Sequence, residues 1–113
     1  MRILFNFRNV DSSEAIKLHA RDKLAKLEKY LPRSAEIEVT VITERHIHRA
    51  DMCIHARGAR YQSCEESEDM YASINLAVDK LDRQLRDHSA TRTTRRRQGQ
   101  ALDDLDYVEN AVS

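Results

Sequence analysis

Glycine, proline, cysteine and tryptophan are scarce in this sequence of 113 residues, which has two glycines, one proline, two cysteines and no tryptophan. So few glycines leave little material for a glycine-rich phosphate loop, and neither such a loop nor a GxSxG turn occurs. Two cysteines are too few for a disulfide framework. No apolar run is long enough to span a membrane or follows the pattern of a signal peptide. We therefore expect a cytoplasmic protein without membrane contact.

Aromatic residues are also few, at 5% of the chain, whereas hydrophobic residues make up 41%. A chain of this length has room for one domain with a small, aliphatic core. Such a core leaves little space for a large buried active-site cavity. We expect no cofactor and no small-molecule substrate.

The charges cancel over the whole chain, with 19 basic and 19 acidic residues, but they are unevenly distributed. Every lysine and arginine precedes residue 101, whereas residues 101–113 contain acidic residues and no base: Asp103, Asp104, Asp106 and Glu109. The body is therefore mildly basic, which is compatible with binding to a polyanion, although many cytosolic domains carry a similar excess.

Apolar residues that alternate with polar ones predict four strands, in residues 2–7, 35–44, 50–57 and 60–66. Gly58 lies between the last two and suits the tight turn of a hairpin. The last three strands follow one another directly. They should therefore form an antiparallel meander.

Apolar residues repeated every three or four positions predict two helices. The first begins near Asp11 and Glu14, which have capping-box spacing, and ends at Pro32. The second spans residues 68–88 with Ser67 as its N-cap. The order β-α-β-β-β-α predicts an α+β two-layer sandwich, a four-stranded sheet with both helices packed on one face.

Residues 89–113 lack the apolar periodicity of the preceding segments and are rich in threonine, arginine and glutamine at first. This composition is typical of a mobile tail. We therefore expect a domain over residues 1–91 and a flexible tail over residues 92–113, basic and then acidic.

Both predicted helices carry basic residues outside their apolar stripes. A turn of about 100° per residue places them on three flanks: Lys23 and Lys26 with His19 and Tyr30, Lys17 and Arg21 opposite, and Lys80, Arg83 and Arg86 on the second helix. Helices packed side by side would bring basic rows to one groove at the spacing of phosphates. Charged helix faces also occur for solubility alone, so each residue by itself is weak evidence.

A competing hypothesis of metal binding or catalysis rests on the segment "ERHIHRADMCIH" at residues 44–55. It contains four residues that bind zinc in other proteins: His46, His48, Cys53 and His55. The HxH and CxH spacings match no common structural or catalytic zinc site. We therefore expect no metal site and no enzyme activity.

Three segments resemble one known family: "KLAKLEKYLPR" (23–33), "HRADMCIHARG" (48–58) and above all "EDMYASINLAVDKLDRQLRDH" (68–88). They are similar to the ribosome hibernation promoting factors and ribosome-associated inhibitors, also called sigma-factor modulation proteins. The resemblance covers residues 1 to about 92. It implies a domain laid out like double-stranded RNA-binding domains, positioned on the small ribosomal subunit between head and body.

In that place the protein would occupy the decoding region, where messenger RNA and transfer RNAs lie, and would keep idle ribosomes inactive. The resemblance transfers contact with ribosomal RNA to Lys23, Lys26, Lys80, Arg83 and Arg86, and more weakly to Lys17 and Arg21. It also highlights Asp69 and Tyr71, which we assign to structure: Asp69 to the first turn of the second helix and Tyr71 to the edge of its apolar stripe.

Two departures from the family pattern concern the end of the chain. Short members stop soon after the second helix, and long members continue into a dimerisation domain that this chain has no room for. We expect a short or tailed form that is monomeric off the ribosome. Four arginines of the tail should help RNA binding: Arg92, Arg95, Arg96 and Arg97. The alternative is a free RNA-binding or sigma-factor modulating protein that is not stably ribosome-bound.

Overall fold

The computed structural model describes the backbone of residues 1–97 and the side chains of residues 1–88. The elements follow the predicted order β-α-β-β-β-α, with the first helix continued by a 3₁₀ segment. They are β1 (Arg2–Arg8), α1 (Glu14–Leu24), η1 (Ala25–Tyr30), β2 (Glu36–Glu44), β3 (Ile47–Ala56), β4 (Ala59–Ser67) and α2 (Met70–Arg97).

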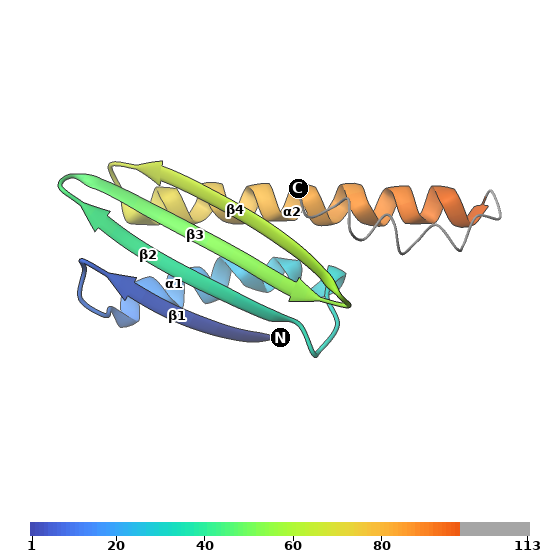
Figure 1. Cartoon of the computed structure of the whole chain (residues 1–113), viewed down its shortest axis with the longest axis horizontal. Helices are drawn as coiled ribbons and strands as arrows, with labels where there is room; N and C mark the ends of the chain where they lie inside the picture. The colour runs from blue at the N-terminus through green and yellow to red at the C-terminus, as the bar shows by residue number, and fades with distance from the viewer. Residues whose placement is uncertain (98–113) are drawn as a thin grey trace.

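The four strands form one sheet in the order β1-β2-β3-β4 (Figure 1). Strand β1 is parallel to β2, and the other two pairs are antiparallel, which confirms the meander. Arg57 and Gly58 connect β3 to β4 with positive φ angles of 52° and 77°. Two successive positive φ angles match the right-handed twist of a two-residue hairpin, so the predicted turn is confirmed.

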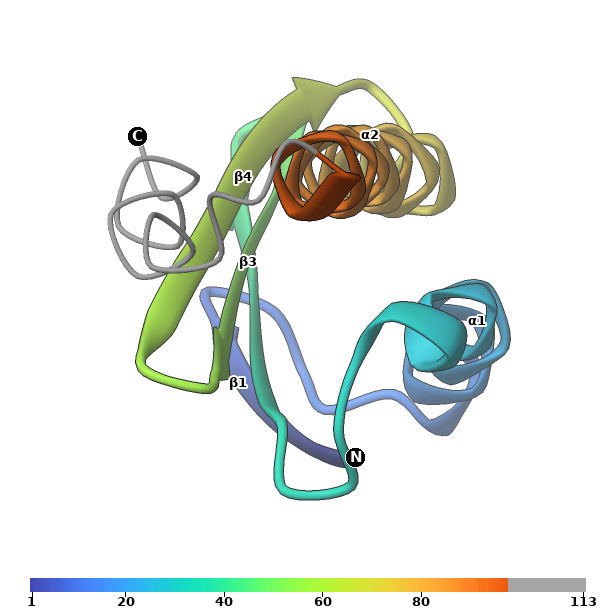
Figure 2. The same ribbon diagram turned by 90° about the vertical axis from the view of Figure 1, so that its right-hand side faces the viewer.

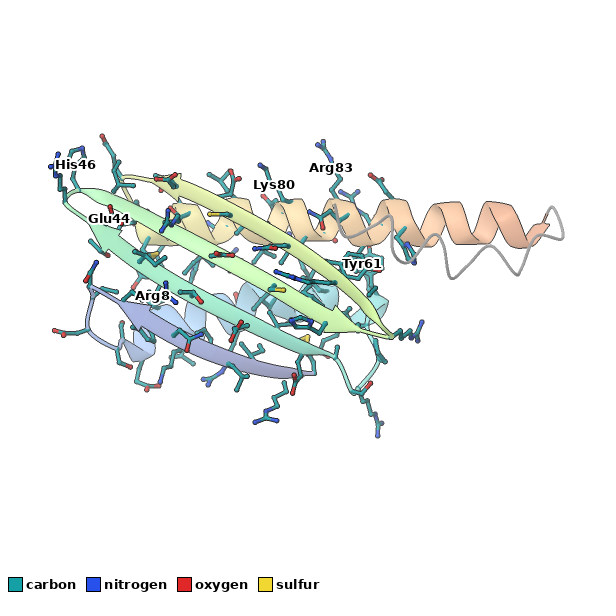
Figure 3. All side chains as sticks on the ribbon, viewed as in Figure 1. Arg8, Glu44, His46, Tyr61, Lys80 and Arg83 are labelled. Carbon is teal, nitrogen blue, oxygen red and sulfur yellow. The ribbon has the colours of Figure 1, made fainter. Side chains whose placement is uncertain are left out.

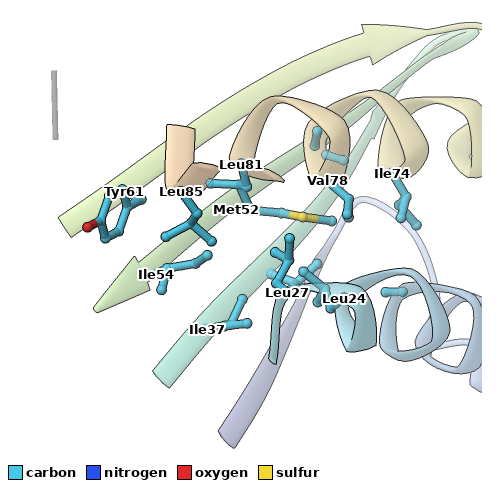
Figure 4. Packing of buried hydrophobic residues seen from close by; sticks show 14 of the residues in the cluster. Leu24, Leu27, Ile37, Met52, Ile54, Tyr61, Ile74, Val78, Leu81 and Leu85 are labelled. Carbon is cyan, nitrogen blue, oxygen red and sulfur yellow. The ribbon is translucent and has the colours of Figure 1, made fainter. Parts of the chain in front are cut away.

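Both helices cover the same face of the sheet, which confirms the predicted α+β sandwich (Figure 2). The core lies between the layers, and α2 contributes Ile74, Val78, Leu81 and Leu85 to it (Figure 4). Met52 and Ile54 from β3 and Leu24 and Leu27 from the first helical segment meet them there. Most of the buried side chains between the layers are aliphatic, and the buried polar ones are Ser63, Ser73 and His88.

The first helix begins and ends differently from the prediction. Its N-cap is Ser13, whose Oγ accepts a hydrogen bond from the backbone N–H of Ile16 at 3.2 Å, so the prediction of Asp11 as the cap was wrong. After Leu24 the helix tightens into η1. A 3₁₀ segment aligns residues three apart, and this keeps Leu24 and Leu27 together on the core.

Helix α2 begins at Met70, and its first turn is capped by Asp69 rather than Ser67. Asp69 Oδ1 accepts a hydrogen bond from the backbone N–H of Tyr71 at 3.3 Å. Ser67 Oγ instead lies 2.7 Å from Ser73 Oγ, which donates to the carbonyl oxygen of His48 at 2.6 Å. The prediction of Ser67 as the N-cap was therefore wrong, and its hydroxyl ties the start of α2 to the sheet.

Helix α2 also continues to Arg97, past its predicted end at His88, and projects beyond the sheet (Figure 1). The segment after His88 lacks apolar residues to pack, but it contains arginine, a strong helix former, and no glycine or proline before Gly99. The predicted boundary at residues 91/92 thus falls inside α2. Arg92, Arg95, Arg96 and Arg97 belong to a helix rather than to the flexible arm we predicted. The acidic end, residues 101–113, lies outside the described residues.

Over residues 1–97, no helix is both long enough and apolar enough to cross a membrane.

Candidate nucleic-acid interface

Helices α1 and α2 lie on the same face of the sheet, side by side (Figure 2). We call the line of contacts between the two helical segments the helix seam; it is formed by His19, Lys26, Tyr71, Asn75 and Asp79. His19 Nε2 lies 2.8 Å from Asn75 Oδ1, and Lys26 Nζ lies 2.8 Å from Asp79 Oδ1. Both contacts advance in the same direction along the two helical segments. The seam therefore joins helices that run parallel to each other.

An exposed tyrosine lies in the helix seam. The rings of His19 and Tyr71 meet edge to face with their centroids 4.9 Å apart. Because His19 also contacts Asn75, the tyrosine ring is supported by a side chain that is itself held in place. Tyr71 remains 39% exposed and lies outside the core cluster, which agrees with our assignment of this residue to the edge of the apolar stripe.

Lys17 and Arg21 lie on the flank of α1 that faces β1, away from the helix seam. Lys17 Nζ is 5.9 Å from the centroid of the Phe7 ring, and Arg21 Cζ is 5.3 Å from that of Phe5. These are cation–π contacts, and they cover half-buried aromatic rings of the edge strand with long aliphatic stems. Two of the basic residues of α1 therefore pack on the edge strand of the sheet.

Lys23 lies one turn after His19, on the same flank of α1, so it faces the helix seam together with Lys26. On α2, Arg86 lies near the seam side, where its Nε is 3.4 Å from Asp82 Oδ2. The seam thus holds bases from both helices. It also holds two carboxylates, from Asp79 and Asp82.

Lys80 and Arg83 project from α2 on the side away from α1 (Figure 3). Lys80 Nζ pairs with Glu65 Oε2 on β4 at 2.6 Å, whereas Arg83 has no carboxylate partner among the described side chains. The expectation that basic rows of both helices border one groove is therefore wrong for these two residues. Asp79 and Asp82 occupy the positions that face α1, and one helical step of 100° turns Lys80 away from them.

The ion pair between Lys26 and Asp79 is exposed and leaves the cation available to a polyanion. Lys26 and Asp79 keep 44% and 66% of their side-chain surface exposed. Exposed pairs of this kind contribute only about 0–1 kcal/mol to stability, because water and salt screen them. A phosphate can therefore replace Asp79 as the partner of Lys26 at small cost. Glu65 and Asp82, the partners of Lys80 and Arg86, keep only 19% of their side-chain surface exposed, so the argument does not extend to those two pairs.

The histidines and the cysteine of the metal hypothesis are separated along the sheet. His46 lies in the β2–β3 turn, and His48 Nδ1 contacts Thr43 Oγ1 at 3.3 Å. Cys53 and His55 lie together, with Sγ and Nε2 3.4 Å apart. Within the part of the chain that the structure describes, no three His, Cys, Asp or Glu side chains form a group able to hold a metal ion.

The topology defines the class of this protein, an α+β sandwich domain with a mixed four-stranded sheet and both helices on one face. Solved structures share this fold. The N-terminal domain of Protein Y from Thermus thermophilus aligns with a TM-score of 0.69 and 29% identity, over 75% of this chain and 96% of that one. A ribosomal subunit interface protein from Coxiella burnetii aligns with a TM-score of 0.69 over 80% of this chain and 99% of that one; at 23% identity it shows the fold alone.

The sequence profile of the family described as "Sigma 54 modulation protein / S30EA ribosomal protein" matches residues 3–93. The chain belongs to this family. It is 35% identical over 88 residues to the ribosome hibernation promoting factor of Escherichia coli K12, covering 78% of this chain and 93% of the relative. It is 32% identical over 100 residues to the factor of the same name from Azotobacter vinelandii, covering 88% of this chain and 92% of the relative.

Proposed function

We propose that this protein is a ribosome hibernation factor that binds the small ribosomal subunit in the decoding region and keeps idle ribosomes inactive. The observation that carries the proposal is the match over 93% of the length of a relative named for ribosome hibernation. Ribosome binding places its work in the cytosol. The chain acts as a binding protein, not as an enzyme.

The bases of the helix layer supply the contacts to ribosomal RNA in this proposal. Lys23, Lys26 and Arg86 lie along the helix seam, whereas Lys80 and Arg83 project from the other side of α2. Basic residues on two sides of one helix suit binding inside a cleft, where RNA lies on more than one side of the protein. They suit binding to the surface of a single RNA duplex less well. Their binding to phosphates releases condensed counterions, which is the main source of affinity for such contacts.

Tyr71 adds a contact of another kind. Unstacked RNA bases pack on exposed aromatic rings, and each such contact contributes about 1–3 kcal/mol to binding. The ring of Tyr71 is exposed and already held by His19, so little conformational freedom is lost when a base stacks on it. The helix seam therefore offers a stacking ring beside His19, about two helical turns before Asp79, the partner of Lys26.

Sedimentation tests the proposal. The purified chain is mixed with small subunits, large subunits or intact ribosomes and centrifuged through sucrose gradients at several salt concentrations. We expect comigration with small subunits and intact ribosomes, and an affinity that falls steeply with salt because several phosphate contacts are made. Comigration with large subunits alone would contradict the small-subunit site. A flat salt response would contradict the phosphate contacts.

The second candidate is a free RNA-binding or sigma-factor modulating protein, which the family description "Sigma 54 modulation protein" favours. In that case the chain stays at the top of the gradient in the presence of every ribosomal particle. Binding to a purified sigma factor, measured by calorimetry, then becomes the decisive measurement.

A further inference from the structure

Both cysteines lie on the open face of the sheet, opposite the helices. Cys53 on β3 pairs in register with Gln62, and Cys64 on β4 pairs with Asp51. The two thiols are therefore diagonal neighbours on adjacent strands. Their surroundings differ in burial, in charge and in hydrogen bonding.

Cys53 is surrounded by a cation and a base. Arg60 Nε donates a hydrogen bond to Cys53 Sγ at 3.3 Å, and Arg60 Nη2 donates to Gln62 Oε1 at 3.0 Å, which fixes the guanidinium. His55 Nε2 lies 3.4 Å from the same sulfur. The sulfur thus has a guanidinium donor on one side and an imidazole nitrogen close enough to exchange a proton with it on the other.

Cys64 has the opposite environment, although it is the more exposed cysteine. Partial burial and the negative charge of Asp51 raise the pKa of its thiol, and Glu66 and Glu65 raise it further against the opposing effect of Arg49. At neutral pH a smaller fraction of Cys64 is therefore thiolate than in an ordinary exposed cysteine. The thiolate is the nucleophile, so this thiol reacts slowly.

An open hollow of about 330 Å³ lies at the end of the sheet that holds the β3–β4 turn; Cys53 does not line it, but both of its side-chain contacts, His55 and Arg60, do. His55 and Arg60 line it, together with Arg57, Glu36 and Ser34. Cys53 itself is only 8% exposed, which disfavours attack on bulky reagents and suits a reactant of a few atoms that enters beside His55 and Arg60.

We propose that Cys53 is a site of oxidation by hydrogen peroxide, assisted by His55 and Arg60. His55 accepts the thiol proton, and the thiolate sulfur attacks one peroxide oxygen. An S–O bond forms, the O–O bond breaks, and sulfur loses two electrons. The departing hydroxide takes the proton from His55 and leaves as water, so one thiol and one peroxide yield one sulfenic acid and one water.

The sheet geometry disfavours a disulfide between the two cysteines as the product. Diagonal neighbours on adjacent strands have Cα atoms about 7–8 Å apart. Disulfides require about 4.4–6.8 Å, so closure would need a shift of the backbone. The modification therefore ends at the sulfenic acid of Cys53 unless a thiol in solution reacts with it.

The experiment compares the two cysteines within the same molecule. The chain is treated with limiting hydrogen peroxide, sulfenic acid is trapped with a dimedone reagent, and peptide mass spectrometry gives the rate at each cysteine in buffer and in denaturing urea. We expect Cys53 to react at least about fivefold faster than Cys64 in buffer and both to react at similar rates in urea. Equal rates in buffer, faster reaction at Cys64, or a preference that persists in urea would overturn the proposal.

A matched pair of variants tests the role of Arg60. Arg60→Gln removes the donor to sulfur and should slow oxidation of Cys53 about tenfold. Arg45→Gln removes the same charge from the β2–β3 turn, at the other end of the sheet, and should leave the rate unchanged. Equal effects of the two variants would contradict a specific contact. The comparison in urea uses the unaltered chain, so the test holds even if Arg60→Gln proves unstable.

Discussion

The two sides of α2 differ in the charges that they carry and in what those charges contact. Toward α1, Asp79 pairs with Lys26 and Asn75 contacts His19, so polar groups help to hold the helix layer together. On the other side, Arg83 projects outward without a carboxylate partner among the described residues. The comparison shows that the polar and charged residues of one helix divide between holding the domain together and remaining available to a partner.

Charge reversal of three basic residues, which lie on the two sides of α2, should weaken binding to small subunits more than any other change. In the variant Lys26→Glu, Arg83→Glu, Arg86→Glu, three contacts that attract phosphate become repulsive, and we expect affinity for small subunits to fall more than about a hundredfold. The three side chains are exposed, so thermal unfolding should stay cooperative. Sedimentation and circular dichroism check the two results. An unfolded variant would show instead that these residues are structural.

Replacement of the seam tyrosine should have a smaller effect of a different kind. Tyr71→Ala removes a stacking ring and no charge, so we expect about tenfold weaker binding with an unchanged dependence on salt. Tyr71→Phe should bind like the unaltered chain. Leu76→Ala is the matched control, because Leu76 is also an exposed side chain of α2. A change in the salt dependence, or equal losses for Leu76→Ala and Tyr71→Ala, would contradict stacking.

The sequence predicted those parts of the fold in which burial repeats regularly. Val39, Val41 and Met52 alternate with polar neighbours, and their side chains are fully buried under the helices. Gly58 was predicted as the turn because it adopts positive φ freely, and it does so here. Where one face of a strand or helix meets the core, the period of the apolar residues is enough to determine the element.

Helix ends and side-chain partners could not be predicted in the same way. After His88 the apolar residues no longer repeat every three or four positions. This change marks where α2 stops packing on the sheet, whereas the helix itself continues to Arg97. The division of bases between the two sides of α2 depends on where α1 packs, and that is a tertiary contact. The positions of Tyr71, Asn75 and Asp79, each four residues apart, were the available signal for the seam.

Removal of Asp79, the acidic partner of Lys26, should slightly increase the affinity for small subunits. Asp79→Asn frees Lys26 from its ion pair and removes a repulsive charge, so we expect about threefold tighter binding at low salt and no difference at high salt. Asp22→Asn is the matched control, because Asp22 lies exposed on α1 and changes the net charge equally. Filter binding to small subunits measures both. Equal gains for the two variants would assign the effect to net charge instead of Lys26.

Deletion of the acidic end, residues 101–113, should change the affinity for small subunits least. Asp103, Asp104 and Asp106 should be repelled by the phosphates that attract the arginines before them, so their deletion should leave affinity unchanged or slightly higher. Deletion of residues 92–113 also removes the four arginines at the end of α2, and should lower affinity and flatten the salt dependence. Titration of both truncated chains against small subunits separates the two contributions. A large loss from the shorter deletion would show that the acidic end makes a favourable contact, for example with a basic ribosomal protein.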